Sequence, residues 1–93
     1  MRLTLDVGCG NKKLGAINVD IDRTCKPDVI CDIHHLPFRN ELFSIVFCHH
    51  VLEHKGVIPE KAIKELLRVS RDRVEIQVPH WLSVNAKKKT LLT

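Results

Sequence analysis

Apolar and polar residues alternate along three stretches of the chain, which is the period of a β-strand with one buried face. Two further short runs, one rich in β-branched residues and one almost continuously apolar, are also typical of strands. The five expected strands are Leu3–Val7, Ile17–Ile21, Asp28–Cys31, Ser44–Cys48 and Arg73–Val78. Pro79 ends the last of them, because proline has no amide to donate to a sheet.

One stretch has the period of a helix. Over Pro59–Arg71 the apolar residues Ala62, Ile63, Leu66 and Leu67 recur at spacings of three and four, so they form a single stripe. A proline at the first position favours this start, since no amide donor is needed there. With one clear helix for five strands, we expect a sheet covered on one face and partly wet on the other, unless a second subunit covers it.

The composition is that of one small domain over residues 1–93, with a core over 1–80 and a C-terminal tail over 81–93, since 44% of the 93 residues are apolar and 28% are charged. The four cysteines form no C-x-x-C pair, and we expect no secretory leader and no membrane segment, hence a cytoplasmic protein with reduced thiols. The net charge of +4 permits nucleic-acid contact, but no interleaved aromatic platform favours it.

A glycine-rich turn, Gly8–Gly10, follows the first expected strand. In α/β folds this is the usual place of a nucleotide ligand, since glycines let the backbone approach the ligand closely. A dinucleotide site would need a third glycine at Lys13 and a helix at the pyrophosphate, and Asn11–Ala16 is too short for that helix. The sequence therefore favours a ligand without pyrophosphate, although Lys12 and Lys13 keep a phosphate open and a simple tight turn is the alternative.

Two acidic residues stand near the ends of the second and third expected strands. Asp20 is placed to accept hydrogen bonds from both hydroxyls of a ribose, with Asp22 as the weaker competitor and a turn-capping role as the alternative. Asp32 is placed to accept from an adenine amino group, and the neighbouring Ile33 offers an apolar side chain and an amide to the ring. These positions favour a nucleoside as part of the ligand.

These motifs, in this order, resemble a class I S-adenosylmethionine-dependent methyltransferase of the small type 11 branch. The resemblance covers residues 3–80 and is carried by Asp6–Gly10, Ile17–Asp20, Cys31–Phe38, Phe43–His54 and Ala62–Val69. It implies a Rossmann-like parallel sheet ordered 3-2-1-4-5, with the cofactor over the C-terminal strand ends. It also implies that S-adenosyl-L-methionine is the cofactor and that its methyl group passes to an acceptor by in-line displacement.

The resemblance further implies a set of cofactor-binding residues. The turn after the first strand holds the methionine part, the acids after the second and third strands meet ribose and adenine, and the end of the fourth strand lies near the methionine end. In that order the residues are Gly8, Cys9 and Gly10, with Asp6 as anchor of the loop or of the methionine amine; Asp20 and Ile21; Asp32 and Ile33; Cys48 and His49.

Two of the six histidines are candidates for catalysis. His49 and His50 stand nearest the expected methyl group, and histidine titrates near neutral pH, so either is a candidate base if the acceptor must lose a proton. A structural role is the alternative for both. The run His50–His54 also fits the H-x-x-E-H pattern of zinc proteases. Because a five-residue pattern often matches by chance, we expect no metal ligand.

The chain departs from the resemblance in ways that bear on its partners. It lacks the helix after the glycine turn, and we expect it to lack the last two strands of the family as well. An unprotected fifth strand invites pairing with another chain, so we expect a homodimer or a partner protein at that edge. A catalytically incomplete cofactor-binding or interaction module is the alternative function. Trp81 is expected at a contact, at a substrate rim, or folded back into the core.

Overall fold

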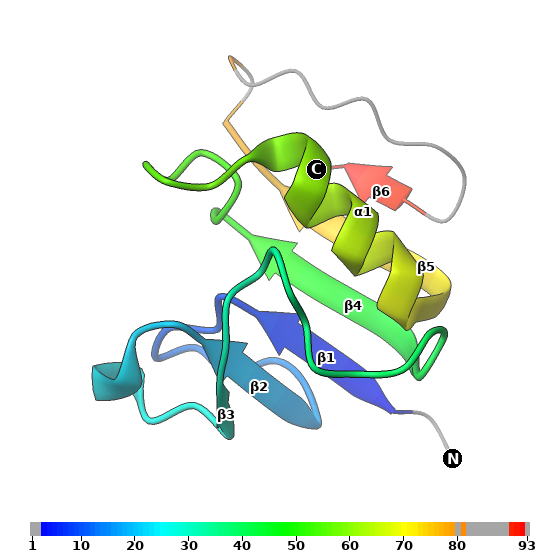
Figure 1. Ribbon diagram of the computed structural model, residues 1–93, viewed down its shortest axis with the longest axis horizontal. Coiled ribbons are helices and arrows are strands. Elements are labelled where there is room, and N and C mark those ends of the chain that lie inside the picture. Colours follow the sequence, from blue (N-terminus) through cyan, green and yellow to red (C-terminus); the bar gives the residue numbers. More distant parts are fainter. Residues whose placement is uncertain (1–2, 80, 82–89, 93) are drawn as a thin grey trace.

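The computed structural model describes residues 3–79, 81 and 90–92, which contain a parallel β-sheet and one α-helix (Figure 1). The strands are β1 (Thr4–Val7), β2 (Ile17–Asp20), β3 (Val29–Ile30), β4 (Phe43–His49), β5 (Ser70–Gln77) and β6 (Thr90–Leu92). The 3-10 helix η1 (Arg23–Cys25) precedes β3, and the helix α1 (Pro59–Val69) connects β4 to β5. The strands stand in the order β3-β2-β1-β4-β5-β6, and each neighbouring pair is parallel.

The expected α/β sheet with the order 3-2-1-4-5 is confirmed. The largest difference in bounds is the start of β5, which begins at Ser70 rather than at Arg73. The amide and the hydroxyl of Ser70 both donate to the carbonyl of Leu67, so this buried residue closes α1 and opens the strand at once. The polar run Arg71–Arg73 concealed that start in the sequence pattern.

The far edge of β5 differs from the expectation of an open strand. Thr90–Leu92 form β6, which pairs with β5 at Val74, Glu75 and Ile76. The expectation of an exposed edge was therefore wrong at these positions, and the homodimer or partner that it suggested stays a prediction. Trp81 is 66% exposed and does not fold back into the core. The rest of the expected tail, 82–89 and 93, lies outside the described residues, as does His80.

The hydrophobic core lies on the face of the sheet that α1 covers. Figure 1 shows α1 in front of β4 and β5, and the segment 31–42 crosses the same face in front of β1 and β2. Buried side chains from the strands meet those of the helix and of this segment; they are Leu5, Val7, Val19, Val46, Cys48, Val74 and Ile76 with Ala62, Ile63, Leu66, Val69, Ile33 and Leu36. No helix in the described ranges has the length and apolar character needed to cross a membrane.

The opposite face carries polar side chains, because neighbours along a strand point to opposite faces. Asp6 and Asn18 are buried there, while Glu75 is half-buried. Asn18 is satisfied by hydrogen bonds with the backbone of Gly15 and with the carboxylate of Asp28. This face is therefore polar over β1 and β2, as expected, but Asp6 and Asn18 are more buried there than expected.

One arginine fastens α1 to the segment that crosses the core. The guanidinium of Arg68 donates to the carbonyls of Leu36 at 2.9 Å and Phe38 at 2.7 Å, and it forms an ion pair with Glu65 at 2.6 Å. Glu65 in turn accepts from the amide of Leu36 at 2.9 Å. The planar fork of arginine makes these contacts together, and a lysine ammonium has no such fork.

We expect Arg68→Lys to lower the free energy of unfolding by about 1–3 kcal/mol, since two carbonyls of the crossing segment lose a charged donor. Urea denaturation followed by circular dichroism measures the change. The matched control is Arg71→Lys, because Arg71 is exposed and its contact with Asp72 is 3.5 Å long, so a change below about 0.5 kcal/mol is expected there. Equal effects of the two substitutions would contradict the role given to Arg68.

Candidate functional site

The C-terminal ends of β1, β2 and β4 meet around the glycine turn that follows β1. Gly8 and Gly10 adopt positive φ angles of 71° and 54°. Residues other than glycine adopt such angles only at a cost in conformational energy. The amides of Gly8 and Cys9 both donate to the carbonyl of Val19, at 2.9 and 3.0 Å. The turn is thus folded over the end of β2, where Asp20 stands.

Asp20 is bound to both neighbouring loops and still has acceptor capacity. One carboxylate oxygen accepts from the amide of Gly10 at 2.9 Å, and the other accepts from the amide of Asp22 at 3.0 Å. An ionised carboxylate offers about four lone-pair directions, so each oxygen retains one for a further donor. The predicted ribose-binding residue is therefore held in a fixed orientation by the glycine turn itself.

Asp6 lies beneath the turn and closes its far end. Its carboxylate accepts from the amide of Leu14 at 2.9 Å, and the residue is only 2% exposed. Burial raises the pKa of Asp6, while the Leu14 amide and then the nearby His49 partly offset that rise. Of the two roles expected for Asp6, the loop anchor is visible in the structure.

Asp32 follows β3 and is fixed by the residue two positions later. The amide of His34 reaches Oδ1 of Asp32 at 2.9 Å, and the His34 ring nitrogen Nδ1 lies 2.7 Å from the same oxygen. The backbone hydrogen bond from His34 is the main reason that the pKa of Asp32 lies below its usual value. Asp32 therefore stays ionised at neutral pH, with Oδ2 left to accept from a ligand.

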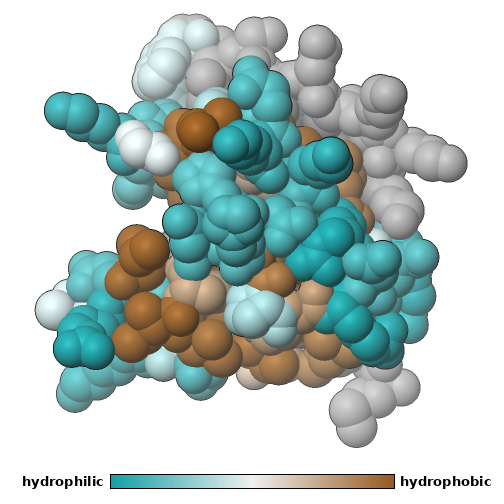
Figure 2. All heavy atoms as spheres, in the orientation of Figure 1, coloured by the Kyte–Doolittle hydropathy of each residue, from teal (hydrophilic) through white to brown (hydrophobic). Residues whose placement is uncertain are grey.

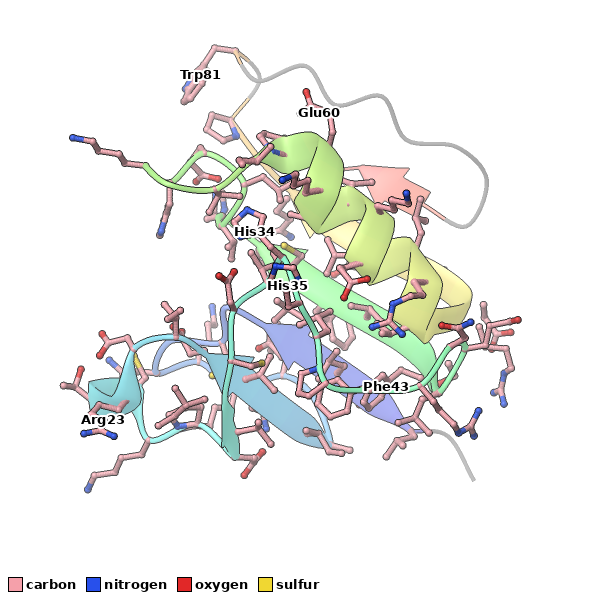
Figure 3. The ribbon with its side chains drawn as sticks, in the orientation of Figure 1. Arg23, His34, His35, Phe43, Glu60 and Trp81 are labelled. Atoms are coloured by element: carbon pink, nitrogen blue, oxygen red, sulfur yellow. The ribbon has the colours of Figure 1, made fainter. Side chains whose placement is uncertain are left out.

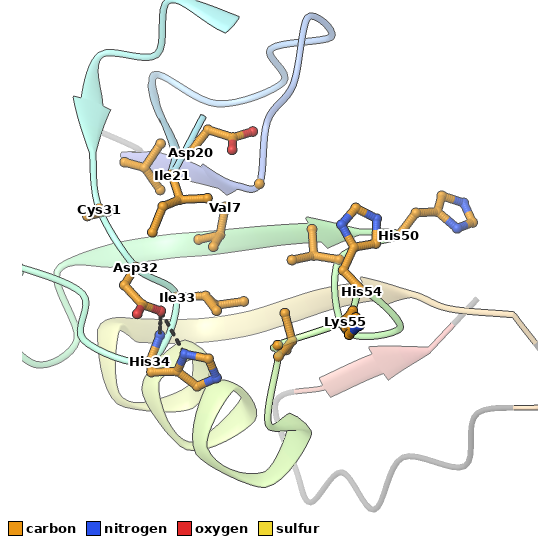
Figure 4. A pocket seen from close by; sticks show the side chains of 15 residues that line it. Val7, Asp20, Ile21, Cys31, Asp32, Ile33, His34, His50, His54 and Lys55 are labelled. Atoms are coloured by element: carbon orange, nitrogen blue, oxygen red, sulfur yellow. Dashed lines mark hydrogen bonds and ion pairs between the residues drawn. The ribbon is translucent and has the colours of Figure 1, made fainter. Parts of the chain in front are cut away.

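A cavity of about 360 Å³ opens between these elements at the C-terminal edge of the sheet. Figure 4 shows Asp20 and Ile21 on one side, Asp32 and His34 on another, and His50, His54 and Lys55 across from them. In Figure 2 the surface is hollowed at this edge, and apolar side chains gather along the margin formed by β2 and β3. The lining residues are Val7, Gly8, Val19, Asp20, Ile21, Cys31, Asp32, Ile33, His34, His50, Val51 and 54–57.

A second cavity of about 270 Å³ lies on the other side of the glycine turn. Its lining residues are Asp6, Gly8, Cys9, Lys12, Leu14, His49, His50 and Gln77. Gly8 and His50 line both cavities, so the two spaces adjoin at this pair. We call them the larger and the smaller cavity.

The predicted site residues separate between these two cavities. Asp20, Ile21, Asp32 and Ile33 line the larger one, whereas Asp6, Cys9 and His49 line the smaller one, and Gly8 lines both. Gly10 lines neither but holds Asp20 through its amide. The group expected to hold adenosine and the group expected near the methionine therefore occupy neighbouring but distinct spaces.

Cys48 does not lie where the sequence suggested. Its side chain is fully buried in the core, and this burial raises the pKa of its thiol to about 12. The preceding strand pattern was continuously apolar, so it did not show which of Cys48 and His49 would face the core. Burial also raises the pKa of Cys9 to about 11. Both thiols are therefore protonated and unreactive at neutral pH.

The two candidate bases differ in their surroundings. Nε2 of His49 lies 2.8 Å from a carboxylate oxygen of Glu75 on the neighbouring strand, and both side chains are about one-fifth exposed, at 21% and 22%. His50 is 63% exposed and has a positive φ of 58°, which is uncommon for a residue other than glycine. Its amide donates to the carbonyl of Gln77 at 2.7 Å, so the sheet holds it in this conformation.

Sequence reasoning missed one wall of the larger cavity. His34, Val51 and the run 54–57 line it, although none of them was assigned a binding role from the sequence. The glycine at position 56, with φ of 91°, was the sequence feature closest to a warning of a tight turn there. Within the ranges that the structure describes, no three histidine, cysteine or acidic side chains come together as a metal site.

An open parallel sheet with a glycine turn at its switch point and acids at the next two strand ends defines a Rossmann-like, methyltransferase-like domain. Residues 15–74 match the sequence profile of the family described as "Methyltransferase domain". The chain belongs to this family.

Two individual proteins extend the comparison. The chain is 33% identical over 90 residues to the uncharacterized protein MJ0638 of Methanocaldococcus jannaschii, across 82% of this chain and 39% of that protein. Its fold matches the crystal structure of the [4+2]-cyclase SpnF with a TM-score of 0.62 and 21% identity, across 77% of this chain and 36% of that one. The second likeness concerns the fold, and in both cases this chain spans well under half of its counterpart.

Proposed function

We propose that this chain binds S-adenosyl-L-methionine in the two adjoining cavities and transfers its methyl group to an acceptor. The observation that carries the proposal is the separation of the predicted residues. Those expected at adenosine line the larger cavity, those expected near the methionine line the smaller one, and Gly8 with His50 stands between them. A volume of about 360 Å³ for the larger space lies within the usual range of small-molecule sites.

The acceptor groups and apolar side chains of the larger cavity fit a nucleoside. Asp20 accepts from the ribose hydroxyls, and Asp32 accepts from the adenine amino group through its remaining oxygen. Ile21 is 67% exposed at the rim and Ile33 is buried below it, so apolar side chains are available to the faces of the base. None of these four groups is cationic, and Lys55 lies on the opposite wall of the cavity. This arrangement suits a cofactor that carries no phosphate.

The charged groups of the smaller cavity fit the amino-acid part of the cofactor, which carries an ammonium and a carboxylate. Asp6 and His49, whose ring is paired with Glu75 on the neighbouring strand, offer acceptors for an ammonium, and Lys12 offers a cation for a carboxylate. When bound, the cofactor supplies an electrophilic methyl group. The protein's share of the reaction is to hold donor and acceptor in line, which is the main requirement of such a displacement.

The test is calorimetric titration of the purified chain with S-adenosylmethionine and S-adenosylhomocysteine. We expect saturable binding of both and much weaker binding of ATP, since Lys55 is the one lysine or arginine among the described residues that line the larger cavity, and a single cation does not form a phosphate cradle. Absence of heat from a folded protein would refute the proposal. Binding without methyl transfer to any of a panel of small molecules, peptides and RNA would identify a cofactor-binding module instead.

Ile21→Ala tests the apolar rim within the same titration. Because the side chain is 67% exposed in the structure, its loss leaves the folding free energy almost unchanged. Its burial against a base contributes about 1–2 kcal/mol, so we expect affinity for S-adenosylhomocysteine to fall about five- to thirtyfold. The matched control is Ile30→Ala, since Ile30 is also exposed, at 51%, but lines neither cavity. A similar loss in the control would contradict the placement of the base.

A further inference from the structure

His34 lies between two walls of the larger cavity. One wall is the segment that follows β3, with Asp32 and Ile33, and the other is the loop 50–58 that connects β4 to α1. Figure 3 shows His34 and the adjacent His35 at the bend of the segment beside α1. The two differ in exposure: the side chain of His34 is only 14% exposed, while His35 is exposed and does not line the cavity.

Each ring nitrogen of His34 has a partner on a different wall. Nδ1 lies 2.7 Å from Oδ1 of Asp32, and Nε2 lies 2.9 Å from the amide nitrogen of Ile58. A backbone amide only donates, so Nε2 accepts with its lone pair and carries no proton. The proton of the neutral ring is then on Nδ1 and points to Asp32. These contacts define one tautomer, and in that tautomer the ring bridges the two walls.

The loop 50–58 has few other polar attachments in the described part of the chain. Its amides at 54 and 57 bond within the loop, to the carbonyls of Val51 and His54. Hydrogen bonds to other segments stand at its two ends, from His50 to Gln77 and from Ile58 to His34. Between them the buried Leu52 packs into the core. The end next to α1 also lacks a capping side chain of its own, so His34 is its polar attachment.

We propose that His34 is a positioning residue for the cofactor, which holds both walls of the larger cavity in place only while its ring is neutral. The proposal rests on the proposed function. It extends that function by making cofactor affinity dependent on pH. The neutral ring orients Asp32 for the adenine amino group and keeps the loop 50–58 closed against the ligand.

Protonation opposes one of the two contacts. A proton on Nε2 faces the Ile58 amide, so two donors meet and the bond to the loop is lost, while the bond to Asp32 is kept. The titratable and charged groups on the surrounding elements are Asp32 and His35 on its own segment, Asp20 at the end of β2, His50, Glu53, His54 and Lys55 on the loop, and Glu60 in the first turn of α1.

The experiment measures S-adenosylhomocysteine affinity between about pH 5.5 and 8.5, the range in which histidine changes charge. Loss of one hydrogen bond corresponds to about tenfold in affinity, so we expect the wild type to bind about tenfold more weakly at the acid end. His34→Gln keeps an acceptor for Ile58 and does not titrate. Because this variant loses the donor that Nδ1 presents to Asp32, we expect it to bind about tenfold more weakly than the wild type at pH 8.5 and to lose most of the pH dependence.

The matched control is His35→Gln, which we expect to keep the wild-type pH profile. His34→Ala loses both contacts, so it should bind about a hundredfold more weakly at pH 8.5 and show a flat profile. An unchanged pH profile in His34→Gln, or a flattened one in His35→Gln, would overturn the proposal, because the titrating group would then be another histidine of the site.

A second readout separates this proposal from the proposed function. In ¹⁵N nuclear magnetic resonance spectra of the chain without ligand, His34 should show a protonated Nδ1 and an unprotonated Nε2 at pH 8.5. The Ile58 amide should shift and exchange faster as His34 takes up a proton. If neither S-adenosylmethionine nor its product binds but these signals appear, the proposed function fails and the bridge stands. If the Ile58 amide signal does not change when His34 takes up a proton, the bridge from His34 to Ile58 is itself refuted.

Discussion

Replacing Asp20 with alanine is expected to weaken S-adenosylhomocysteine binding by about a hundredfold or more. Hydrogen bonds to a charged group contribute about 1.5–3 kcal/mol each, and Asp20 has two acceptor directions left after those that Gly10 and Asp22 occupy. The substitution also frees the amide of Gly10, so the glycine turn loses one of its attachments to the end of β2 and keeps those of Gly8 and Cys9 to Val19. Calorimetric titration measures the affinity, and urea denaturation separates it from any loss of stability.

Two substitutions by asparagine test whether the charge of Asp20 or only the size of its side chain matters for binding. Asp20→Asn keeps the size of the side chain and one acceptor oxygen, so we expect an intermediate loss of about tenfold. Asp22→Asn is the matched control, because Asp22 caps η1 through Thr24 and lines neither cavity. We expect it to bind like the wild type. Equal losses at both positions would mean that Asp20 acts through the net charge of the loop and not through contact with the ribose.

The sequence pattern predicted those parts of the fold that depend on local periodicity. Each of the five expected strands is present. In three of them alternation reports directly which face of the strand is buried, and in the other two a short apolar or β-branched run indicated a strand. The alternation pattern did not predict β6, since Thr90–Leu92 is three residues long and is too short to show a polar–apolar repeat. Its pairing with β5 depends on chain geometry, and short sequence windows do not contain that information.

The sequence predicted the acidic residues of the candidate site at the strand ends, but not the contact between His34 and Ile58. Asp20 and Asp32 stand where a strand ends, and parallel strands bring such positions to one edge of the sheet. Their meeting therefore follows from topology alone. The bridge from His34 to Ile58 joins residues 24 positions apart through the packing of a loop on a helix end. No spacing rule encodes that contact, and so the residue that closes the cavity was missed.

Gly8 is a position where a single methyl group should disturb both cavities, because Gly8 lines both of them. A Cβ built there would lie 2.3 Å from Cγ2 of Val51, and the other branch atoms of that side chain are 3.3 Å away. Valine is stiff at χ1, and its Cβ and both γ-carbons lie close to the added methyl group. We therefore expect the loop 50–58 to move. The φ of 71° adds the strain of a left-handed residue. The wall of the larger cavity and the junction with the smaller one are disturbed together.

We therefore expect Gly8→Ala to lower the free energy of unfolding by about 3 kcal/mol, of which about 1–2 kcal/mol is backbone strain and the rest is overpacking. S-adenosylhomocysteine affinity should fall at least about thirtyfold, since the displaced loop lines the cavity. Gly10→Ala is the matched control: its φ is also positive, at 54°, but nothing lies within 4 Å of the added Cβ. It should show the strain without the overpacking.

The double substitution Gly8→Ala with Val51→Ala isolates the steric part. Removing both γ-carbons of Val51 clears the 2.3 Å contact, so the pair should be less destabilised than the sum of the two single changes, by about 1 kcal/mol or more. Affinity should recover in part, because the loop can return to its place beside the glycine turn. If the two changes simply add, Gly8 is required for its φ alone. The close approach of the loop 50–58 to the turn would then play no part in shaping the site.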